Sequence, residues 1–266
     1  MARAEELADQ GWEPTEEIKR CPACGAEGKI WSFRLGPSTF KSADFPCICL
    51  DHEEDIVERK RKDELAQMYE RSLEKQVSVD LWDKANFETF QVSPFNQNVF
   101  DRCKIYNAHR TNEPRSMLVI GNTGTGKTRL VLASARKEVR RLGISARFLP
   151  LDLYFVHMFG HKNRERLDYE YEMKTVPFLI LDELEIPQKS FDRELMESWL
   201  RRLLEHRLGN KLPTLMTLNA VSQDECKQKL GEKINSRVFN RELCEVLQIQ
   251  PHERDDFRLY GAVSAE

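Results

Sequence analysis

The sequence lacks several features that would place the protein in a specialised class. No apolar run reaches about 18 residues, which excludes a helix that spans a membrane. Residues 1–10 are rich in charge and contain no apolar stretch, so we expect no signal peptide and a cytoplasmic location. Internal repeats and low-complexity tracts are also missing, which excludes a repeat architecture.

The chain also lacks an excess of positive charge. Its net charge is −3 at pH 7 and its isoelectric point is about 6.2, so no general basic field attracts nucleic acid. Any contact with DNA must therefore be local. Two basic clusters are available for it, although a solvated helix face of mixed charge is the default interpretation of both. The clusters are Arg201, Arg202 and Arg207, and Arg59–Lys62.

Length and composition indicate one core domain with a small accessory module. The chain has 266 residues, of which 40% are hydrophobic, and this suffices for an α/β core of about 180 residues. We expect the module over residues 1–50, a linker over 51–80 and the core domain over 81–266. The linker is rich in acids and bases, which indicates a charged helix and hinge, with a partner-binding helix as the alternative. Its weak apolar stripe consists of Ile56, Leu65, Met68 and Leu73.

The most informative segment is Ser116–Thr128. It consists of an apolar strand-like run and the pattern G-x-x-x-x-G-K-T, and a helical pattern follows over 129–142. This is the context that a phosphate-binding P-loop requires. Glycines let the backbone wrap a phosphate chain with its N–H groups inward, at a helix N-terminus whose dipole favours anions. We therefore predict a nucleotide site formed by Gly121, Asn122, Thr123, Gly124, Thr125, Gly126, Lys127 and Thr128.

The end of the P-loop and a second strand-like run supply the groups for hydrolysis. Lys127 is expected to reach the β- and γ-phosphates, and the Thr128 hydroxyl to bind Mg²⁺. The apolar run Val176–Leu181 ends in Asp182 and Glu183. We expect Asp182 to support the magnesium ion and Glu183 to polarise the water that attacks the γ-phosphate. The alternative is a strand that stops at a charged turn.

Two further polar residues follow along the chain. The strand-like run Pro213–Leu218 ends in Asn219, which is placed to orient the attacking water or to touch the γ-phosphate. Residues 231–239 are expected to form a short helix that presents Arg237. Taken singly, Asn219 suits an ordinary turn and Arg237 a solvated helix face. Their order after a P-loop and an Asp-Glu strand favours roles in ATP hydrolysis.

Four of the seven cysteines lie close together near the N-terminus, as Cys21-Pro-Ala-Cys24 and Cys47-Ile-Cys49. A Cys-Pro-x-Cys-Gly knuckle directs two thiolates at one tetrahedral ion, and a second pair completes the ligand set. We therefore predict a structural zinc site formed by Cys21, Cys24, Cys47 and Cys49, with His52 as the alternative ligand to Cys49. Disulfides and buried free thiols are the other interpretations, and a reducing cytosol disfavours disulfides. A metal suits a module too short to bury a core of its own.

The core region alternates between strand and helix patterns. The expected strands are 117–121, 145–150, 176–182, 215–219 and 245–249, and the expected helices are 96–109, 129–142, 151–161, 191–207, 222–231 and 233–240. Right-handed crossovers then give an α/β fold with a five-stranded parallel sheet and helices on both faces.

The order of P-loop, Asp-Glu strand, Asn strand and Arg helix is similar to that of AAA+ ATPases. Within this group it resembles the DnaC/DnaI helicase loaders and the related transposition ATPase IstB, over about residues 80–260. Lys127 and Thr128 match the Walker A residues, Asp182 and Glu183 the Walker B pair, Asn219 sensor 1, and Arg237 the arginine finger that acts on a neighbouring subunit's nucleotide.

Two stretches without expected catalytic residues add to the resemblance. Ala85–Phe90 looks like the family's segment before the P-loop, and Leu203–Arg207 like its helix that ends in arginine. Asn122 departs from the family, which usually has proline there; this affects the stiffness of the loop and not its phosphate chemistry. Arg258 occurs where the family has a late arginine, and no role is assigned to it.

The resemblance implies an ATP-dependent replicative helicase loader that acts at the initiation of DNA replication. It implies a core strand order of 5-1-4-3-2, which would bring Asn219 beside the P-loop and Asp182. ATP and Mg²⁺ would bind between the subunits of a homo-oligomer, and the partners would be a hexameric helicase and single-stranded DNA. Loaders of the DnaI type also carry an N-terminal zinc module.

Three other functions compete with this interpretation. An IstB-like transposition helper has the same ATPase residues, but the N-terminal cysteines favour a loader. A small-molecule kinase would need an acceptor pocket and a lid arginine soon after the core, and the Asp-Glu pair and late Arg237 argue against it. A module that only binds nucleotide is disfavoured by the complete set of Lys127, Asp182, Glu183 and Arg237.

Overall fold

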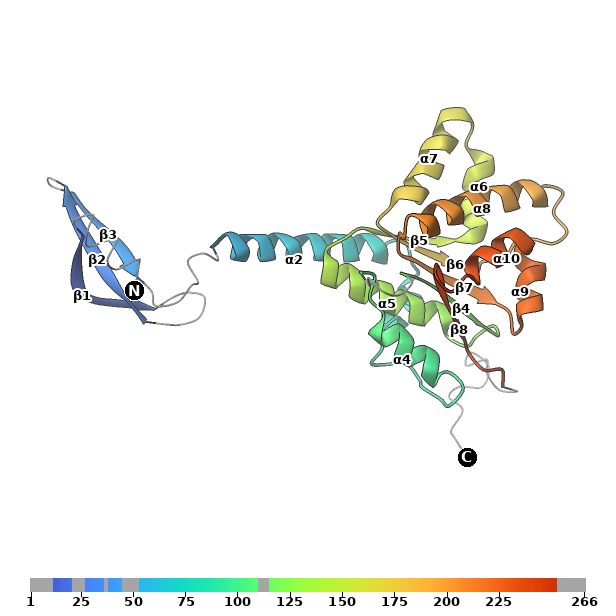
Figure 1. Cartoon of the computed structure of the whole chain (residues 1–266), viewed down its shortest axis with the longest axis horizontal. Helices are drawn as coiled ribbons and strands as arrows, with labels where there is room; N and C mark the ends of the chain where they lie inside the picture. Colours follow the sequence, from blue (N-terminus) through green and yellow to red (C-terminus); the bar gives the residue numbers. More distant parts are fainter. Residues whose placement is uncertain (1–11, 21–26, 36–37, 45–52, 110–114, 253–266) are drawn as a thin grey trace. The chain divides into compact units, whose positions relative to one another are not determined.

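The computed structural model of the chain describes residues 12–20, 27–35, 38–44, 53–109 and 115–252 (Figure 1). The chain divides into two compact units, Met1–Lys62 and Asp63–Glu266. The boundary between them falls inside the helix α2, Glu53–Glu74.

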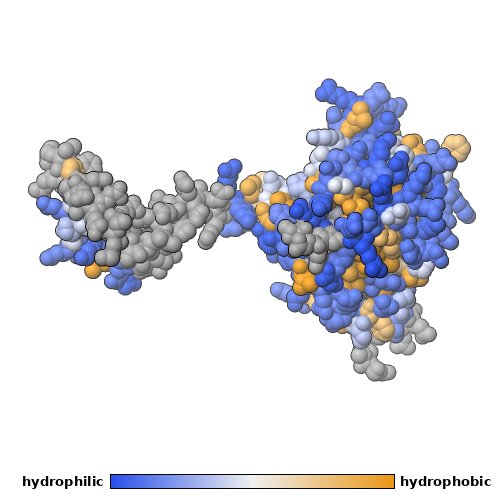
Figure 2. All heavy atoms as spheres, in the orientation of Figure 1, coloured by the Kyte–Doolittle hydropathy of each residue, from blue (hydrophilic) through white to orange (hydrophobic). Residues whose placement is uncertain are grey.

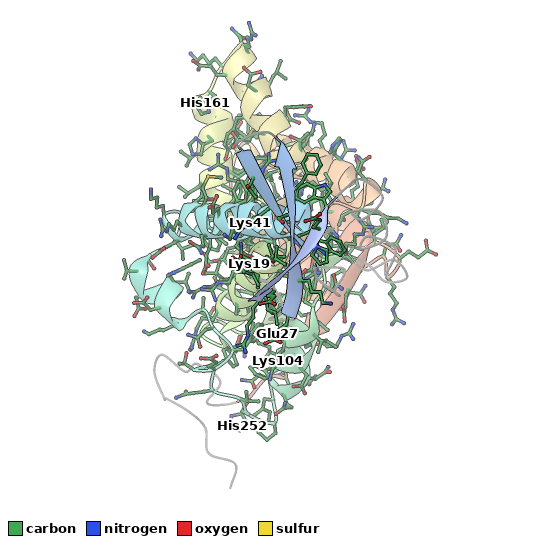
Figure 3. The ribbon with its side chains drawn as sticks, turned by 90° about the vertical axis from the view of Figure 1, so that its left-hand side faces the viewer. Lys19, Glu27, Lys41, Lys104, His161 and His252 are labelled. Carbon is green, nitrogen blue, oxygen red and sulfur yellow. The ribbon has the colours of Figure 1, made fainter. Side chains whose placement is uncertain are left out.

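The described part of the N-terminal unit contains an antiparallel sheet in the order β1-β2-β3. Its strands are β1 Glu13–Arg20, β2 Glu27–Leu35 and β3 Ser38–Asp44. Ile30 and Trp31 of the central strand are buried. Lys41, labelled in Figure 3, forms an ion pair of 2.7 Å with Glu17 across the sheet. The sequence patterns did not predict these three strands.

Two strand ends of this sheet flank the same end of β2. Arg20, the last residue of β1, pairs with Glu27, and Asp44, the last residue of β3, pairs with Lys29. An ion pair of 3.3 Å joins Arg20 to Glu27, which Figure 3 labels. The predicted zinc ligands Cys21 and Cys24 follow β1 in the chain, and Cys47 and Cys49 follow β3; all four, like His52, lie outside the described residues.

The core unit is built on a five-stranded parallel sheet in the order β5-β6-β7-β4-β8. Its strands are β4 Ser116–Gly121, β5 Ala146–Pro150, β6 Phe178–Asp182, β7 Thr214–Asn219 and β8 Cys244–Gln248. From β8 inward this is the order 5-1-4-3-2, so the expected fold class and strand order are confirmed. The strands are covered on both faces, which explains why they appear in the sequence as continuous apolar runs.

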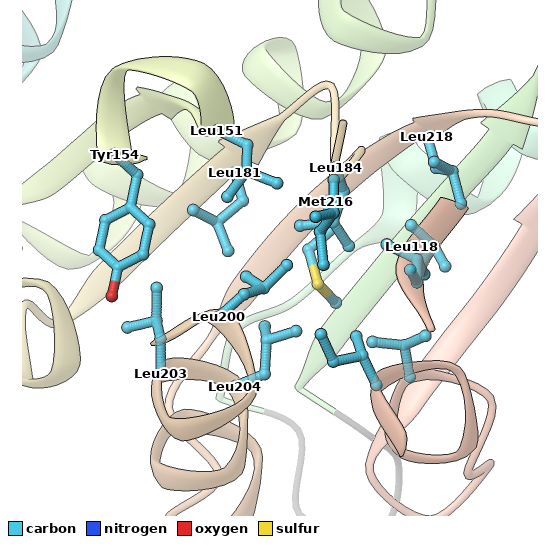
Figure 4. Close-up of a cluster of buried hydrophobic side chains, with 14 of the residues drawn as sticks. Leu118, Leu151, Tyr154, Leu181, Leu184, Leu200, Leu203, Leu204, Met216 and Leu218 are labelled. Carbon is cyan, nitrogen blue, oxygen red and sulfur yellow. The ribbon is translucent and has the colours of Figure 1, made fainter. Parts of the chain in front are cut away.

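Helices cover both faces of the parallel sheet (Figure 1). Successive side chains of a strand point to opposite faces, so Met117 and Val119 of β4 join one hydrophobic cluster and Leu118 and Ile120 the other. The first cluster includes the end of α2 and helices α3 to α5, and the second, drawn in Figure 4, includes helices α6 to α10. The helices are α3 Val79–Lys84, α4 Gln97–Ile105, α5 Lys127–Leu142, α6 Leu151–Gly160, α7 Asn163–Thr175, α8 Arg193–Gly209, α9 Gln223–Leu230 and α10 Glu232–Val238.

The helix α7 was not predicted, nor was the short α3. Charged residues dominate α7, and only Glu170 and Met173 are buried. Burial raises the pKa of the Glu170 carboxyl, but hydrogen bonds and charges from Lys174 and from Arg202 of α8 outweigh burial and lower that pKa. The ion pairs measure 2.8 Å to Lys174 and 3.1 Å to Arg202. We infer that α7 depends on packing against α8, because it has no apolar stripe of its own.

Arg207, near the end of α8, is fully buried, so both interpretations of this residue, as part of a solvated helix face and as a DNA contact, are wrong. Its guanidinium donates to the Thr214 hydroxyl at 2.9 Å and to the carbonyl oxygens of Val176 and Pro213 at 2.8 and 2.9 Å. A further bond of 3.0 Å reaches the carbonyl of Met173 in α7. Burial lowers the pKa of Arg207 to about 9, which still leaves the group charged at neutral pH. This arginine therefore joins α7 to the strands beside it.

Replacement of Arg207 by methionine is expected to lower the free energy of unfolding by at least about 3 kcal/mol, because each buried carbonyl left without a donor costs about 1–3 kcal/mol. Urea unfolding of the full chain measures the loss. The control is Arg202→Met on the same helix, where the arginine is half-exposed and the loss should stay near about 1 kcal/mol. Equal losses in the two variants would contradict the structural role of Arg207.

The surface of the core unit seen in Figure 2 is mainly hydrophilic, with small hydrophobic areas between the polar ones. Val156 of α6 and Leu167 and Tyr171 of α7 are among the exposed apolar side chains. Within the described ranges, no helix combines the length and the hydrophobicity that a membrane crossing requires.

Candidate ATP-binding and hydrolysis site

The P-loop lies between β4 and α5, as the sequence predicts. β4 ends at Gly121 and α5 begins at Lys127. Gly126 has φ +86°, a left-handed conformation, and a Cβ atom there would lie 2.8 Å from the ring of Phe90. Only glycine meets both conditions. The Thr125 hydroxyl closes the turn by donating to the carbonyl of Asn122 at 2.9 Å.

The first turn of α5 is suited to bind an anion. Gly126 is its N-cap and makes no side-chain capping bond. No side chain of the N-cap residue therefore accepts a hydrogen bond from the N–H groups of the first turn. The dipole of this 16-residue helix is also positive at this end. A phosphate group matches both features.

Lys127 is 5% exposed, and its ammonium group lies against the backbone of the P-loop. It donates to the carbonyl oxygens of Gly121 at 3.0 Å and of Asn122 at 2.5 Å. Its charge is thus held beside the loop backbone, where a phosphate chain would lie. The next residue, Thr128, donates from its hydroxyl to Asp182 Oδ1 at 2.7 Å. This bond joins the P-loop to the end of β6.

The Asp182 carboxylate is buried and receives a second hydroxyl. Thr217 of β7 donates to the same Oδ1 atom at 2.6 Å. The following residue, Glu183, is exposed and has φ +52°, a left-handed conformation in a residue with a side chain. Its N–H donates to the Thr217 hydroxyl at 2.9 Å. The Thr217 hydroxyl therefore joins the Asp182 carboxylate to the backbone N–H of Glu183, and the sequence patterns do not identify this threonine as a site residue.

Asn219 lies at the end of β7 and pairs with Gly121 across the β4–β7 register. Because β7 stands between β4 and β6, this places Asn219 next to the first residue of the P-loop and on the strand beside Asp182. Its carbonyl accepts a bond of 2.6 Å from Lys229 of α9, which also forms an ion pair of 3.2 Å with Glu185. The sheet order thus brings Lys127, Thr128, Asp182 and Asn219 to one edge.

Arg237 lies apart from this group. It belongs to α10, its side chain is 52% exposed, and it forms an ion pair of 3.2 Å with Glu205 of α8. Glu205 also pairs with Arg201 at 3.3 Å. The three residues line a surface hollow of about 540 Å³ together with Lys233. In the described part of the chain, the ion pairs and hydrogen bonds of Arg237 run to Glu205 and not to the P-loop.

The segment Ala85–Phe90 packs against the back of the P-loop. The Phe90 ring contacts Gly126, stacks on Phe100 of α4 at 5.7 Å between centroids, and lies under the Arg129 guanidinium at 5.3 Å. Arg129 also donates to the carbonyl of Lys84 at 3.0 Å. These contacts fix the position of the first turn of α5 from outside the sheet.

Some sequence predictions stay without a structural description. Arg258, like the predicted zinc ligands, lies outside the described residues. Among the residues that are described, no group of three or more cysteine, histidine or acidic side chains is arranged to hold a metal ion. In the first basic cluster, Arg201 forms an ion pair with Glu205 of α8 and Arg202 forms one with Glu170 of α7. Both pairs suit the expected helix face of mixed charge, and no observation tests a contact with DNA.

Comparison with known proteins gives structural matches only. No protein-family model matches the sequence, and a search of curated proteins gives no match. The crystal structure of the DnaC helicase loader matches with 21% identity and a TM-score of 0.55, over 65% of this chain and 100% of that one. The replication initiator DnaA bound to AMPPCP and single-stranded DNA matches with 18% identity and a TM-score of 0.54, over 66% of this chain and 52% of that one.

A further match is the AMPPCP-bound DnaA from Aquifex aeolicus, with 17% identity and a TM-score of 0.54, over 66% of this chain and 53% of that one. The aligned part of this chain thus covers the whole DnaC structure and about half of each DnaA structure. At such low identities the likeness shows the fold. The described core thus shares with these structures an α/β fold built on a five-stranded parallel sheet.

Proposed function

We propose that this chain is an AAA+ ATPase that loads a replicative hexameric helicase at the initiation of DNA replication. The observation that carries the ATPase part is the Thr128–Asp182 hydrogen bond, which couples the P-loop to the carboxylate pair at the end of β6. A module that only holds nucleotide has no need for this coupling. The match to the DnaC helicase loader over its whole length supports the loader part.

Magnesium fits this site, because hydroxyl and carboxylate oxygens are the ligands it prefers. When bound, the ion neutralises charge on the phosphates of ATP. Thr128 would supply the hydroxyl oxygen, and Asp182 would hold that hydroxyl in position. Lys127 would bind the β- and γ-phosphates, and the N–H groups of Gly124 and Gly126 would take part in the phosphate cradle.

Three residues would act on the reaction itself. Glu183 would accept the proton of the attacking water, and Asn219 would orient that water or the γ-phosphate. Arg237 would act on the nucleotide of a neighbouring subunit, so the active form would be an ATP-bound homo-oligomer. Two observations support this arrangement. Arg237 is half-exposed, and its ion pair runs to Glu205 and not to the P-loop of its own subunit.

Single-stranded DNA is the proposed nucleic-acid partner, because the matched DnaA structure contains it. The proposal keeps the cytoplasmic location that the sequence predicts. The competing function is an IstB-like transposition helper, which would use the same ATPase residues with a transposase as partner.

Identification of the bound partner distinguishes the two functions. The full chain, tagged and loaded with a non-hydrolysable ATP analogue, is used to isolate partners from extract of its source. We expect the replicative helicase among the captured proteins, with capture reduced for Lys127→Ala. Capture of a transposase instead, with no helicase, would favour the transposition helper.

We also propose a structural zinc site in the N-terminal unit. The register of the small sheet supports this proposal. The last residues of β1 and β3, Arg20 and Asp44, lie on either side of the same end of β2, and one cysteine pair follows each of these strands in the chain. Four thiolates would form a closed tetrahedral site that leaves no position for catalysis. The site would stabilise a small sheet in which Ile30 and Trp31 are buried.

The purified chain is expected to contain about one zinc ion per molecule. Cys24→Ser should release the metal and loosen the N-terminal unit, while the ATP affinity of the core stays almost unchanged. Elemental analysis of protein prepared without chelator measures the metal, and Cys103→Ser, a change at a buried cysteine of α4, is the control. Zinc-free protein, or equal zinc in Cys24→Ser and the wild type, would exclude the site.

A further inference from the structure

Thr217 is a polar residue in the middle of a buried strand. It is 1% exposed, and its neighbours Met216 and Leu218 in β7 are fully buried and apolar. A hydroxyl in such surroundings is unfavourable unless it is hydrogen-bonded. Its partners therefore indicate why a threonine occupies a position that suits valine or isoleucine.

The hydroxyl uses both of its hydrogen-bonding capacities on consecutive residues. It donates its proton to Asp182 Oδ1 at 2.6 Å and accepts the N–H of Glu183 at 2.9 Å. The carbonyl of Thr217 also accepts the N–H of Leu184 at 2.7 Å. Three successive residues at the end of β6 are thus joined to one residue of β7.

The turn at Glu183 depends on such support. A φ of +52° is unfavourable for a residue with a Cβ atom and persists where surrounding contacts impose it. The bonds from Thr217 to Asp182, Glu183 and Leu184 lie on both sides of this residue. They fix the backbone from which the Glu183 carboxylate projects.

The Asp182 carboxylate is held from two directions. Its Oδ1 atom accepts from Thr128 at 2.7 Å on the P-loop side and from Thr217 at 2.6 Å on the β7 side. Loss of the second donor would free the carboxylate to rotate, and the Thr128 hydroxyl would lose its fixed acceptor. Outer-shell groups of this kind commonly set the orientation of a metal ligand.

We infer that Thr217 is a positioning residue for ATP hydrolysis: its hydroxyl orients the Asp182 carboxylate and imposes the backbone turn that presents Glu183. The inference rests on the proposed function, because it assigns the roles of Asp182 and Glu183. A threonine that only satisfies its own buried hydroxyl would contribute to stability alone. The two roles make different predictions for kcat and for Mg²⁺-dependent binding.

The test compares Thr217→Val, which keeps the shape of the side chain and removes the hydroxyl, with Thr217→Ser, which keeps the hydroxyl. The matched control is Thr214→Val, because Thr214 is a buried threonine of the same strand whose hydroxyl bonds to Arg207 and to the carbonyl of Leu212. Each full-length variant is assayed for kcat at saturating ATP. The affinity for fluorescent ADP is measured with and without Mg²⁺, and thermal unfolding reports stability.

We expect Thr217→Val to lower kcat by about 10–100-fold and to weaken the effect of Mg²⁺ on ADP affinity, with ADP affinity in the absence of Mg²⁺ unchanged. Thr217→Ser should retain most of the wild-type values. Thr214→Val should lower the unfolding temperature without a comparable loss of kcat. If Thr217→Val does not fold, Thr217→Cys takes its place, because a thiol of similar size is only a weak donor and acceptor.

Two failures are distinguishable. If the wild type does not hydrolyse ATP, or if Lys127→Ala hydrolyses ATP as fast as the wild type, the proposed function is wrong. If the wild type hydrolyses ATP and Thr217→Val matches it in kcat and in Mg²⁺ response, or falls no further than Thr214→Val, the positioning role of Thr217 is wrong and the proposed function stands.

Discussion

Replacement of Arg237 by alanine is expected to remove the assembly-dependent part of the ATPase activity and to leave the ATP affinity of the isolated subunit almost unchanged. An arginine supplied from a neighbouring subunit stabilises charge in the transition state and accelerates comparable reactions by about 10³–10⁵-fold. Arg237 suits this role because it is half-exposed on α10 and pairs with Glu205 of α8. An exposed ion pair of this kind is weak enough to exchange for a phosphate.

The measurement is the ATPase rate per subunit as a function of protein concentration, with and without single-stranded DNA. In the wild type this rate should rise with concentration, and in Arg237→Ala it should stay low. Arg241→Ala, a change at an exposed arginine shortly after α10, is the matched control and should behave as the wild type. Mixing Arg237→Ala with Lys127→Ala should restore part of the activity, since one variant keeps a working P-loop and the other a working Arg237.

The mixture also provides the decisive negative result. If it stays inactive, and if the wild-type rate per subunit is constant across concentration and DNA, then Arg237 is a surface arginine. The proposal that Arg237 acts on the nucleotide of a neighbouring subunit would then be wrong, although the P-loop could still bind nucleotide within one subunit.

The strands of the parallel sheet and the P-loop could be predicted because each leaves a direct trace in the sequence. A parallel strand covered on both faces, such as β4, must be apolar at successive positions, and Met117, Leu118 and Val119 are all fully buried. The glycine at position 126 follows from its left-handed backbone and its contact with Phe90. Local patterns of this kind do not depend on which element lies next to which.

The order of the strands is a different kind of information. Hydrophobic periodicity reports that β7 is buried, but not that it lies between β4 and β6. That expectation came from the resemblance to AAA+ ATPases. The position of Asn219 beside Gly121 could therefore be predicted only by analogy.

Five of the described elements are not predicted by the sequence, namely β1, β2, β3, α3 and α7, and in two of them the missing pattern is plain. The helix α7 buries only Glu170 and Met173, so it shows no apolar stripe. It is held to α8 by the Glu170–Arg202 ion pair and by the hydrogen bond that Arg207 donates to the carbonyl of Met173. Strand β1 is exposed at nearly every position, so it shows no alternation of polar and apolar residues. Both elements depend on contacts with another element, β1 with β2 and α7 with α8, and not on an apolar pattern of their own.

Thr217 was missed for a related reason. Its only sign in the sequence is a threonine within an apolar run, and β-branched residues are common in strands. Its significance appears once β6 and β7 are seen to be neighbours, because only then does its hydroxyl meet Asp182 and Glu183.

Replacement of Glu183 by glutamine is expected to keep ATP binding and to lower kcat by about 10²–10⁴-fold, the range in which a positioned general base contributes. Glutamine has the shape of glutamate and can occupy the same turn after β6, but it cannot accept the proton of the attacking water. Lys127→Ala should differ from it by weakening ATP binding as well, because the lysine cation lies against the P-loop itself.

The measurements are phosphate release at saturating ATP and the affinity for a fluorescent ATP analogue. Glu185→Gln is the matched control, since Glu185 is an exposed glutamate two positions further along the same loop and pairs with Lys229. It should retain most of the wild-type kcat. Equal rates in the wild type and Glu183→Gln would remove Glu183 as the base. Loss of ATP binding in Glu183→Gln would instead indicate that the substitution had changed the turn after β6. Glutamine has the size of glutamate and lies at an exposed position, so it should not by itself weaken the contacts of Lys127 and the P-loop backbone with the phosphates.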